Sequence, residues 1–64
     1  MTDPAELFAI LTAQIEDLHG LAFEGQAADQ PHELLCALSR SLCCGLQRAN
    51  GTLTQIDNAI IQSE

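Results

Sequence analysis

The sequence has no lysine, valine, tyrosine or tryptophan, and Arg40 and Arg48 are its only arginines. Nine acidic residues give the 64-residue chain a formal net charge of −7. Binding to nucleic acid or to an anionic membrane surface depends on clustered Lys and Arg side chains, so the composition argues against both. An acidic chain is attracted to basic surfaces instead, and we expect its partner to be a protein that carries one.

Two further absences concern where the protein resides. No apolar run approaches the roughly 18 residues of a membrane-spanning helix, and the first residues, MTDPAE, lack the basic start of a secretory signal peptide. The three cysteines are an odd number, which does not describe a closed set of disulfides and fits reduced thiols. We therefore expect a cytoplasmic protein that does not enter a membrane.

The absence of valine and the scarcity of aromatic residues, beside abundant Ala, Leu, Gln and Glu, favour helices over strands. A first helix is predicted over residues 4–19. Asp3 can cap this helix, Pro4 suits its first position, and Glu6 falls three residues after the cap. Gly20 is a common type of stop signal and marks the predicted end. The apolar side chains that recur at helical spacing are Phe8, Leu11, Ile15 and Leu18.

Residues 20–30 are predicted to connect this helix to a second one over residues 31–49, with Pro31 in the first turn. One side of the second helix carries a leucine stripe: Leu34, Leu35, Leu38, Leu42 and Leu46. Another strip holds only small residues: Ala37, Ser41, Gly45 and Ala49. A glycine such as Gly45 inside a helix costs about 1 kcal/mol relative to alanine. We interpret the strip as a ridge that lets another helix approach closely.

Asn50 and Gly51 form a break signal after the second helix. Thr52 followed by Gln55 fits a capping box, which predicts a third helix over residues 53–62. The alternative is one long, kinked helix over residues 31–62.

These elements predict an all-α fold of three helices in an up-down arrangement of helical hairpins, with the second helix in the centre. A chain of this length buries only about 60% of its unfolded surface, so a single copy has a marginal core. The second helix is apolar or thiol-bearing around most of its circumference, which is typical of a central helix. We therefore predict a homodimer joined through the second and third helices. The predicted dimer interface comprises Leu35, Cys36, Leu42, Cys43, Gly45, Leu46, Ile56 and Ile60.

The histidines and cysteines are the candidates for reactive side chains in this sequence. His32 and Cys36 are four residues apart, so they could bind one metal ion together, and a symmetric dimer would supply two such pairs. Cys43 lies on the same side of the helix but about 10.5 Å further along its axis. We interpret the two cysteines as buried packing residues and His19 as a favourable charge at the end of its helix. No metal or other cofactor is expected.

The sequence has no glycine-rich phosphate loop, no group that would orient a nucleophile and its base, and little room for a pocket of about 300 Å³. We therefore do not expect an enzyme. We predict a small regulatory protein that binds a basic surface of another protein and occludes it. The carboxylates would come from the first helix and the connection after it. The predicted partner-binding residues are Glu6, Glu16, Asp17, Glu24 and Asp29.

Three alternative functions stay open at this point. The acidic first half of the chain is compatible with an inhibitor from a mobile element that mimics nucleic acid. His32, Cys36 and Cys43 would serve a metal- or redox-responsive helical module. The third alternative is that the protein is a structural subunit of a larger assembly.

Overall fold

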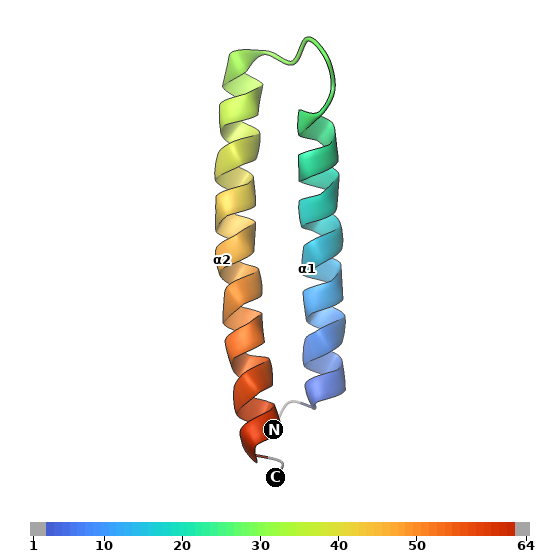
Figure 1. The fold of residues 1–64 in the computed structure, drawn as a ribbon, viewed down its shortest axis with the longest axis vertical. Helices are drawn as coiled ribbons and strands as arrows, with labels where there is room; N and C mark the ends of the chain where they lie inside the picture. The colour runs from blue at the N-terminus through green and yellow to red at the C-terminus, as the bar shows by residue number, and fades with distance from the viewer. Residues whose placement is uncertain (1–2, 63–64) are drawn as a thin grey trace.

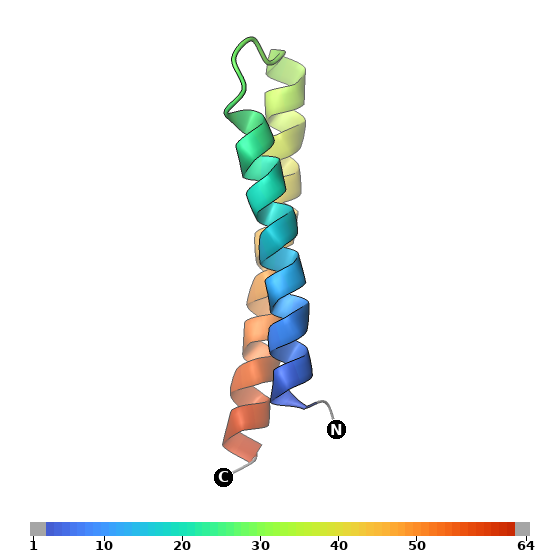
Figure 2. The same cartoon turned by 90° about the vertical axis from the view of Figure 1, so that its right-hand side faces the viewer.

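The computed structural model describes residues 3–62 and folds them into two helices, α1 (Pro4–Gly25) and α2 (His32–Gln62). The helices run antiparallel and side by side, and the loop of residues 26–31 joins them at one end (Figure 1). The hairpin is a rod of 51 × 15 × 13 Å, as the second view also shows (Figure 2). The all-α prediction is confirmed, whereas the described residues contain two helices and not three.

The start of α1 follows the sequence prediction. The Asp3 carboxylate accepts a hydrogen bond from the backbone N–H of Ala5 at 3.3 Å, and Asp3 itself is extended. Its carbonyl oxygen accepts from the N–H groups of Glu6 and Leu7 at 3.0 and 3.1 Å. Pro4 occupies the first helical position, where the missing N–H costs nothing. The prediction of a cap at Asp3 is confirmed.

The predicted stop at Gly20 is wrong, because α1 continues to Gly25. Gly20 keeps a helical backbone, and the following turn adds Leu21 to the contact with α2. The helix ends in a tighter turn, in which Gln26 N–H donates to the Phe23 carbonyl oxygen at 3.0 Å. The Gln30 side chain then donates to the Glu24 carbonyl oxygen at 3.1 Å. The Ala27 N–H donates to the same carbonyl oxygen at 3.3 Å, so groups beyond the end of the helix supply the partners that this oxygen lacks within it.

The predicted break at Asn50–Gly51 is also wrong, and α2 runs without interruption for 31 residues. The predicted capping box does not form. The Thr52 hydroxyl instead shares its proton between the Gln14 side-chain oxygen, at 2.9 Å, and the Arg48 carbonyl oxygen, at 3.2 Å. Thr52 and Ile56 are buried against α1, so packing outweighs the weak local preference for a break. The alternative of one continuous helix is the one observed, starting at His32.

The two helices meet along a row of residues that we call the helix seam. The spacing alternates between three and four residues, as in a coiled coil. The α1 side of the seam comprises Leu7, Leu11, Gln14, Leu18 and Leu21, and the α2 side comprises Leu38, Leu42, Gly45, Ala49, Thr52 and Ile56. Ile56 is the most buried core residue at 2% exposure, followed by Leu7 at 5%.

Small residues occupy the middle of the seam on α2. A delta carbon of Leu18 lies so close to Gly45 that a Cβ atom at this position would collide with it. The sequence therefore predicted the close helix approach at Gly45 and Ala49. Ala37 and Ser41 belong to the same predicted strip, but both are exposed. The contact uses only part of the strip because residues four apart advance by about 40° around a helix, so Ala37 and Ser41 fall on the flank of the seam.

Candidate protein-interaction surface

The acidic charge of the protein is concentrated on one of its two helices. α1 contains four carboxylates and neither Lys nor Arg, which gives this helix a formal charge of −4. α2 balances Glu33 and Asp57 with Arg40 and Arg48, so its formal charge is zero. The helices lie side by side, and one edge of the rod is therefore acidic while the other is neutral.

All five predicted partner-binding residues are exposed, but they do not share one face. Glu6, Asp17 and Glu24 lie within about 20° of one another around α1, at 100° per residue. They form what we call the acidic row, which extends about 27 Å along the helix at 1.5 Å per residue. Glu16 is about 100° away from Asp17, on the outer side of α1. Asp29 lies in the loop, where it adopts a left-handed backbone with φ of 65°.

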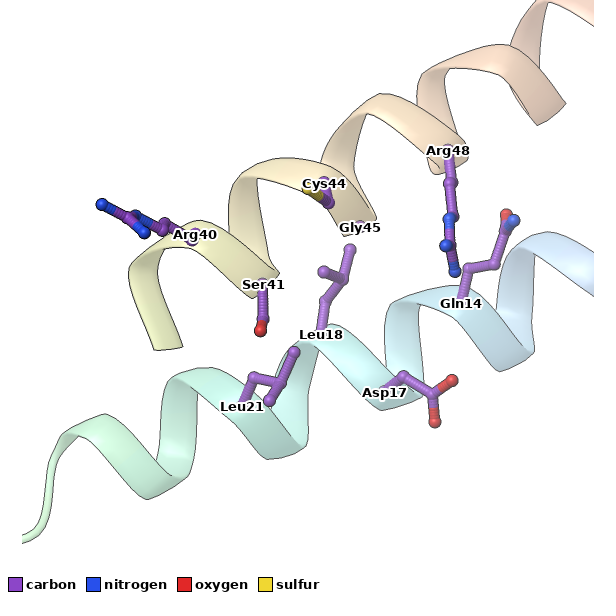
Figure 3. Close-up of a pocket in the computed structure, with 9 residues that line it drawn as sticks. All are labelled: Gln14, Asp17, Leu18, Leu21, Arg40, Ser41, Cys44, Gly45 and Arg48. Carbon is purple, nitrogen blue, oxygen red and sulfur yellow. The ribbon is translucent and has the colours of Figure 1, made fainter. Parts of the chain in front are cut away.

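A groove borders the acidic row at Asp17. Its volume is about 420 Å³, and both helices line it (Figure 3). Arg48 extends from α2 toward α1 beside Gln14, whereas Arg40 points away from α1. Asp17 is exposed, so its carboxylate is accessible to a partner. The lining residues are Gln14, Asp17, Leu18, Leu21, Arg40, Ser41, Cys44, Gly45 and Arg48.

The groove exists because α2 presents small side chains here. Ser41 and Gly45 leave space that a leucine would fill, and Leu18 closes the floor against Gly45. The sequence predicted little room for a pocket of about 300 Å³, and this is incorrect, because the groove has a volume of about 420 Å³. No histidine lines the groove, so neither Ser41 nor Cys44 has an imidazole base beside it.

His32 and Cys36 lie together in the first turns of α2, with 3.5 Å between Nε2 and Sγ. Both are exposed, and the contact agrees with their spacing of four residues. No group of three His, Cys, Asp or Glu residues that could hold a metal ion is found within residues 3–62. Cys36 and Cys43 are exposed in the hairpin, so they do not pack on the other helix of this chain, and their packing against a second copy stays a prediction.

His19 lies inside α1 and not at its end, because the helix continues beyond Gly20. Its ring stacks on Phe23 at a centroid distance of 6.3 Å and an interplanar angle of 19°. The predicted role of His19 at the helix terminus is therefore incorrect.

The residues predicted at a dimer interface divide into two groups. Leu42, Gly45 and Ile56 belong to the helix seam and contact α1 of the same chain. They are used within the hairpin because α1 runs alongside most of α2. The other five remain exposed: Leu35, Cys36, Cys43, Leu46 and Ile60.

Sequence reasoning missed a second exposed surface, on the side of the hairpin away from the groove. Phe8 and Ile15 were assigned to the buried stripe of the first helix, yet they are 49% and 53% exposed. Together with three residues of α2 they form what we call the apolar face: Phe8, Ile15, Leu46, Leu53 and Ile60. Their spacing of seven residues along each helix is the signal that could have revealed this face.

No protein-family model matches the chain, and no curated protein or solved structure matches it either. Within residues 3–62, neither helix combines the length and the apolar character that are needed to cross a membrane.

Proposed function

We propose that this protein is a non-enzymatic regulator that binds a basic surface of another protein through α1 and occludes it. The observation that carries the proposal is the acidic row. Glu6, Asp17 and Glu24 are exposed, lie on one side of a helix without Lys or Arg, and extend along most of that helix. Glu16 and Asp29 add charge beside the row.

The physical effect of such a row is collective. A single exposed ion pair contributes only about 0–1 kcal/mol, because water screens it and the side chains lose freedom. Several like charges along one edge create a field that accelerates encounter with a basic surface and orients it. A rod of 51 Å that lies along a partner's surface also covers it, and this is the basis of the proposed occlusion.

We also propose that the protein works as a homodimer. A compact monomer of 6.9 kDa has an accessible surface of about 4,000 Å², whereas the hairpin exposes 4935 Å². The excess of about 900 Å² matches the roughly 800 Å² that each partner buries in a stable protein interface. Self-association is a direct way for a two-helix chain to cover this surface.

The interaction proposal is tested by affinity capture from a lysate of the source cells. The immobilised wild-type protein is compared with Glu16→Lys/Asp17→Lys and with the control Glu33→Lys/Asp57→Lys, which changes the charge equally on α2. We expect the α1 variant to lose a basic protein that the control retains. With the captured protein purified, its association with the α1 variant should be slower and less dependent on salt. Equal capture by both variants would refute the proposal.

A further inference from the structure

The apolar face combines residues of both helices on one side of the rod. Phe8 and Ile15 directly follow the seam residues Leu7 and Gln14. Leu46 and Leu53 likewise follow the seam residues Gly45 and Thr52. In an antiparallel pair of helices, positions that directly follow seam residues lie on the same side of the pair.

The contacts across the seam also place these residues at matching heights. Gln14 bonds to Thr52, so Ile15 and Leu53, which follow them, lie at one level of the rod. Leu18 contacts Gly45 further along the seam, and Leu46 lies seven residues, or about two turns, from Leu53 along α2. The apolar face therefore extends along the hairpin and combines residues of both helices at the level of Ile15 and Leu53. It holds five of the nine large hydrophobic residues that are exposed within the described residues.

The charged residues of α1 avoid this face. Asp17 and Glu24 directly precede the positions of Leu18 and Gly25, so they lie on the opposite flank, together with the groove. Every member of the apolar face is an uncharged hydrocarbon side chain. A basic partner would have to remove its charges from water to cover such a surface, which is costly.

We propose that a second copy of this chain packs its apolar face onto this one, so that two hairpins form a four-helix bundle with two-fold symmetry. The inference rests on the proposed self-association and specifies the surface. Two chains of −7 each repel one another, and they associate best through a face with few carboxylates. On the side of the apolar face the described helices carry one, Asp57, which directly follows the seam residue Ile56. The excess surface of about 900 Å² is the area that such an interface needs. The acidic row stays outside in the bundle.

The test combines sedimentation equilibrium with circular dichroism, over a hundredfold range of micromolar concentrations. The wild type should have a mass of about 13.8 kDa, twice that of the chain. Leu53→Asp should have the mass of one chain, whereas Thr54→Asp, one residue further and outside the apolar face, should remain a dimer. A helical Leu53→Asp variant that stays dimeric would leave self-association standing but overturn the apolar face as its interface.

The native thiols provide a second measurement that needs no variant. Cys43 follows Leu42 on the apolar-face side of α2, whereas Cys44 lines the groove on the other side. In the bundle, an alkylating reagent should modify Cys43 more slowly than Cys44, and dilution should remove the difference. Equal rates at all concentrations would contradict the proposed packing. A wild-type mass of 6.9 kDa throughout would overturn both self-association and the bundle, and so would association only with phospholipid vesicles.

Discussion

Thr52 of α2 and Gln14 of α1 form a polar bridge in the middle of an otherwise mainly apolar helix seam. The Thr52 hydroxyl donates to the Gln14 side-chain oxygen at 2.9 Å, and Thr52 is only 7% exposed. A polar pair at this depth is satisfied in only one alignment of the two helices, as polar residues in coiled-coil seams are. The pair therefore fixes the register in which Leu7, Leu18 and Ile56 pack.

The first prediction concerns this bridge. Thr52→Val removes the hydroxyl and leaves the Gln14 oxygen without its partner, so we expect it to lower the free energy of unfolding by about 1–3 kcal/mol. Gln14→Leu/Thr52→Val replaces both partners and should recover most of this loss. Urea denaturation at a fixed chain concentration measures both effects. If the double variant is no more stable than Thr52→Val, the bridge does not contribute as proposed.

The second prediction separates three glycines of the helices. A Cβ atom at Gly20 or Gly51 meets nothing within 4 Å, so alanine at either position should raise the free energy of unfolding by about 1 kcal/mol. Gly45→Ala gains the same helix propensity, but its methyl group displaces Leu18. We therefore expect Gly45→Ala to be less stable than Gly51→Ala. Thermal denaturation ranks the three variants, and an equal gain at all of them would contradict the close packing at Gly45.

The third prediction compares two isoleucines near the end of α2. Ile56 is 2% exposed and Ile61 is 67% exposed. Ile56→Ala should lower the free energy of unfolding by about 2–5 kcal/mol, because it removes a buried side chain and leaves a cavity. A chain with so small a core would then be largely unfolded. Ile61→Ala is the control and should change the helical signal little. Similar losses of helicity for both variants would show that the seam is not the stabilising contact.

The fourth prediction concerns the loop. Asp29 is the one residue other than glycine with a positive φ in the described part of the chain, and this backbone costs about 1 kcal/mol or more for a residue with a Cβ atom. Asp29→Gly should therefore raise the free energy of unfolding, by up to about 1 kcal/mol. Ala28→Gly, which only adds freedom to the unfolded chain, should lower it. The opposite order in chemical denaturation would argue against the left-handed turn.

The sequence predicted the elements that depend on local chemistry. The cap at Asp3 needs only a carboxylate and the following N–H groups, so its prediction holds. The predicted helix end at Gly20 and the predicted break at Asn50–Gly51 also rested on local signals. Both predictions were wrong, because each position lies beside residues that pack on the other helix. A glycine inside a helix costs about 1 kcal/mol relative to alanine, and the packing of Leu21 beside Gly20 and of Thr52 beside Gly51 offsets this cost.

The candidate surfaces were only partly predictable for a related reason. The exposure of Glu16 and Asp17 follows from their charge alone. The sequence alone does not show which of the neighbouring apolar rows of α1 is buried, because Phe8 and Leu11 both fit a helical stripe. Only the packing partner decides which row is buried, and α2 selects Leu11. The groove depends in turn on the contact of Leu18 with Gly45, which no pattern within a single helix contains.

The side-by-side placement of an acidic helix and a neutral one gives the molecule an electric moment across its 15 Å width, in addition to any along its length. A cationic surface therefore turns the rod so that it approaches broadside and not end-on. At physiological salt this torque acts within a Debye length of about 8 Å, which is about half the width of the rod. Alignment consequently happens in the last step of the encounter, when the two surfaces are almost touching.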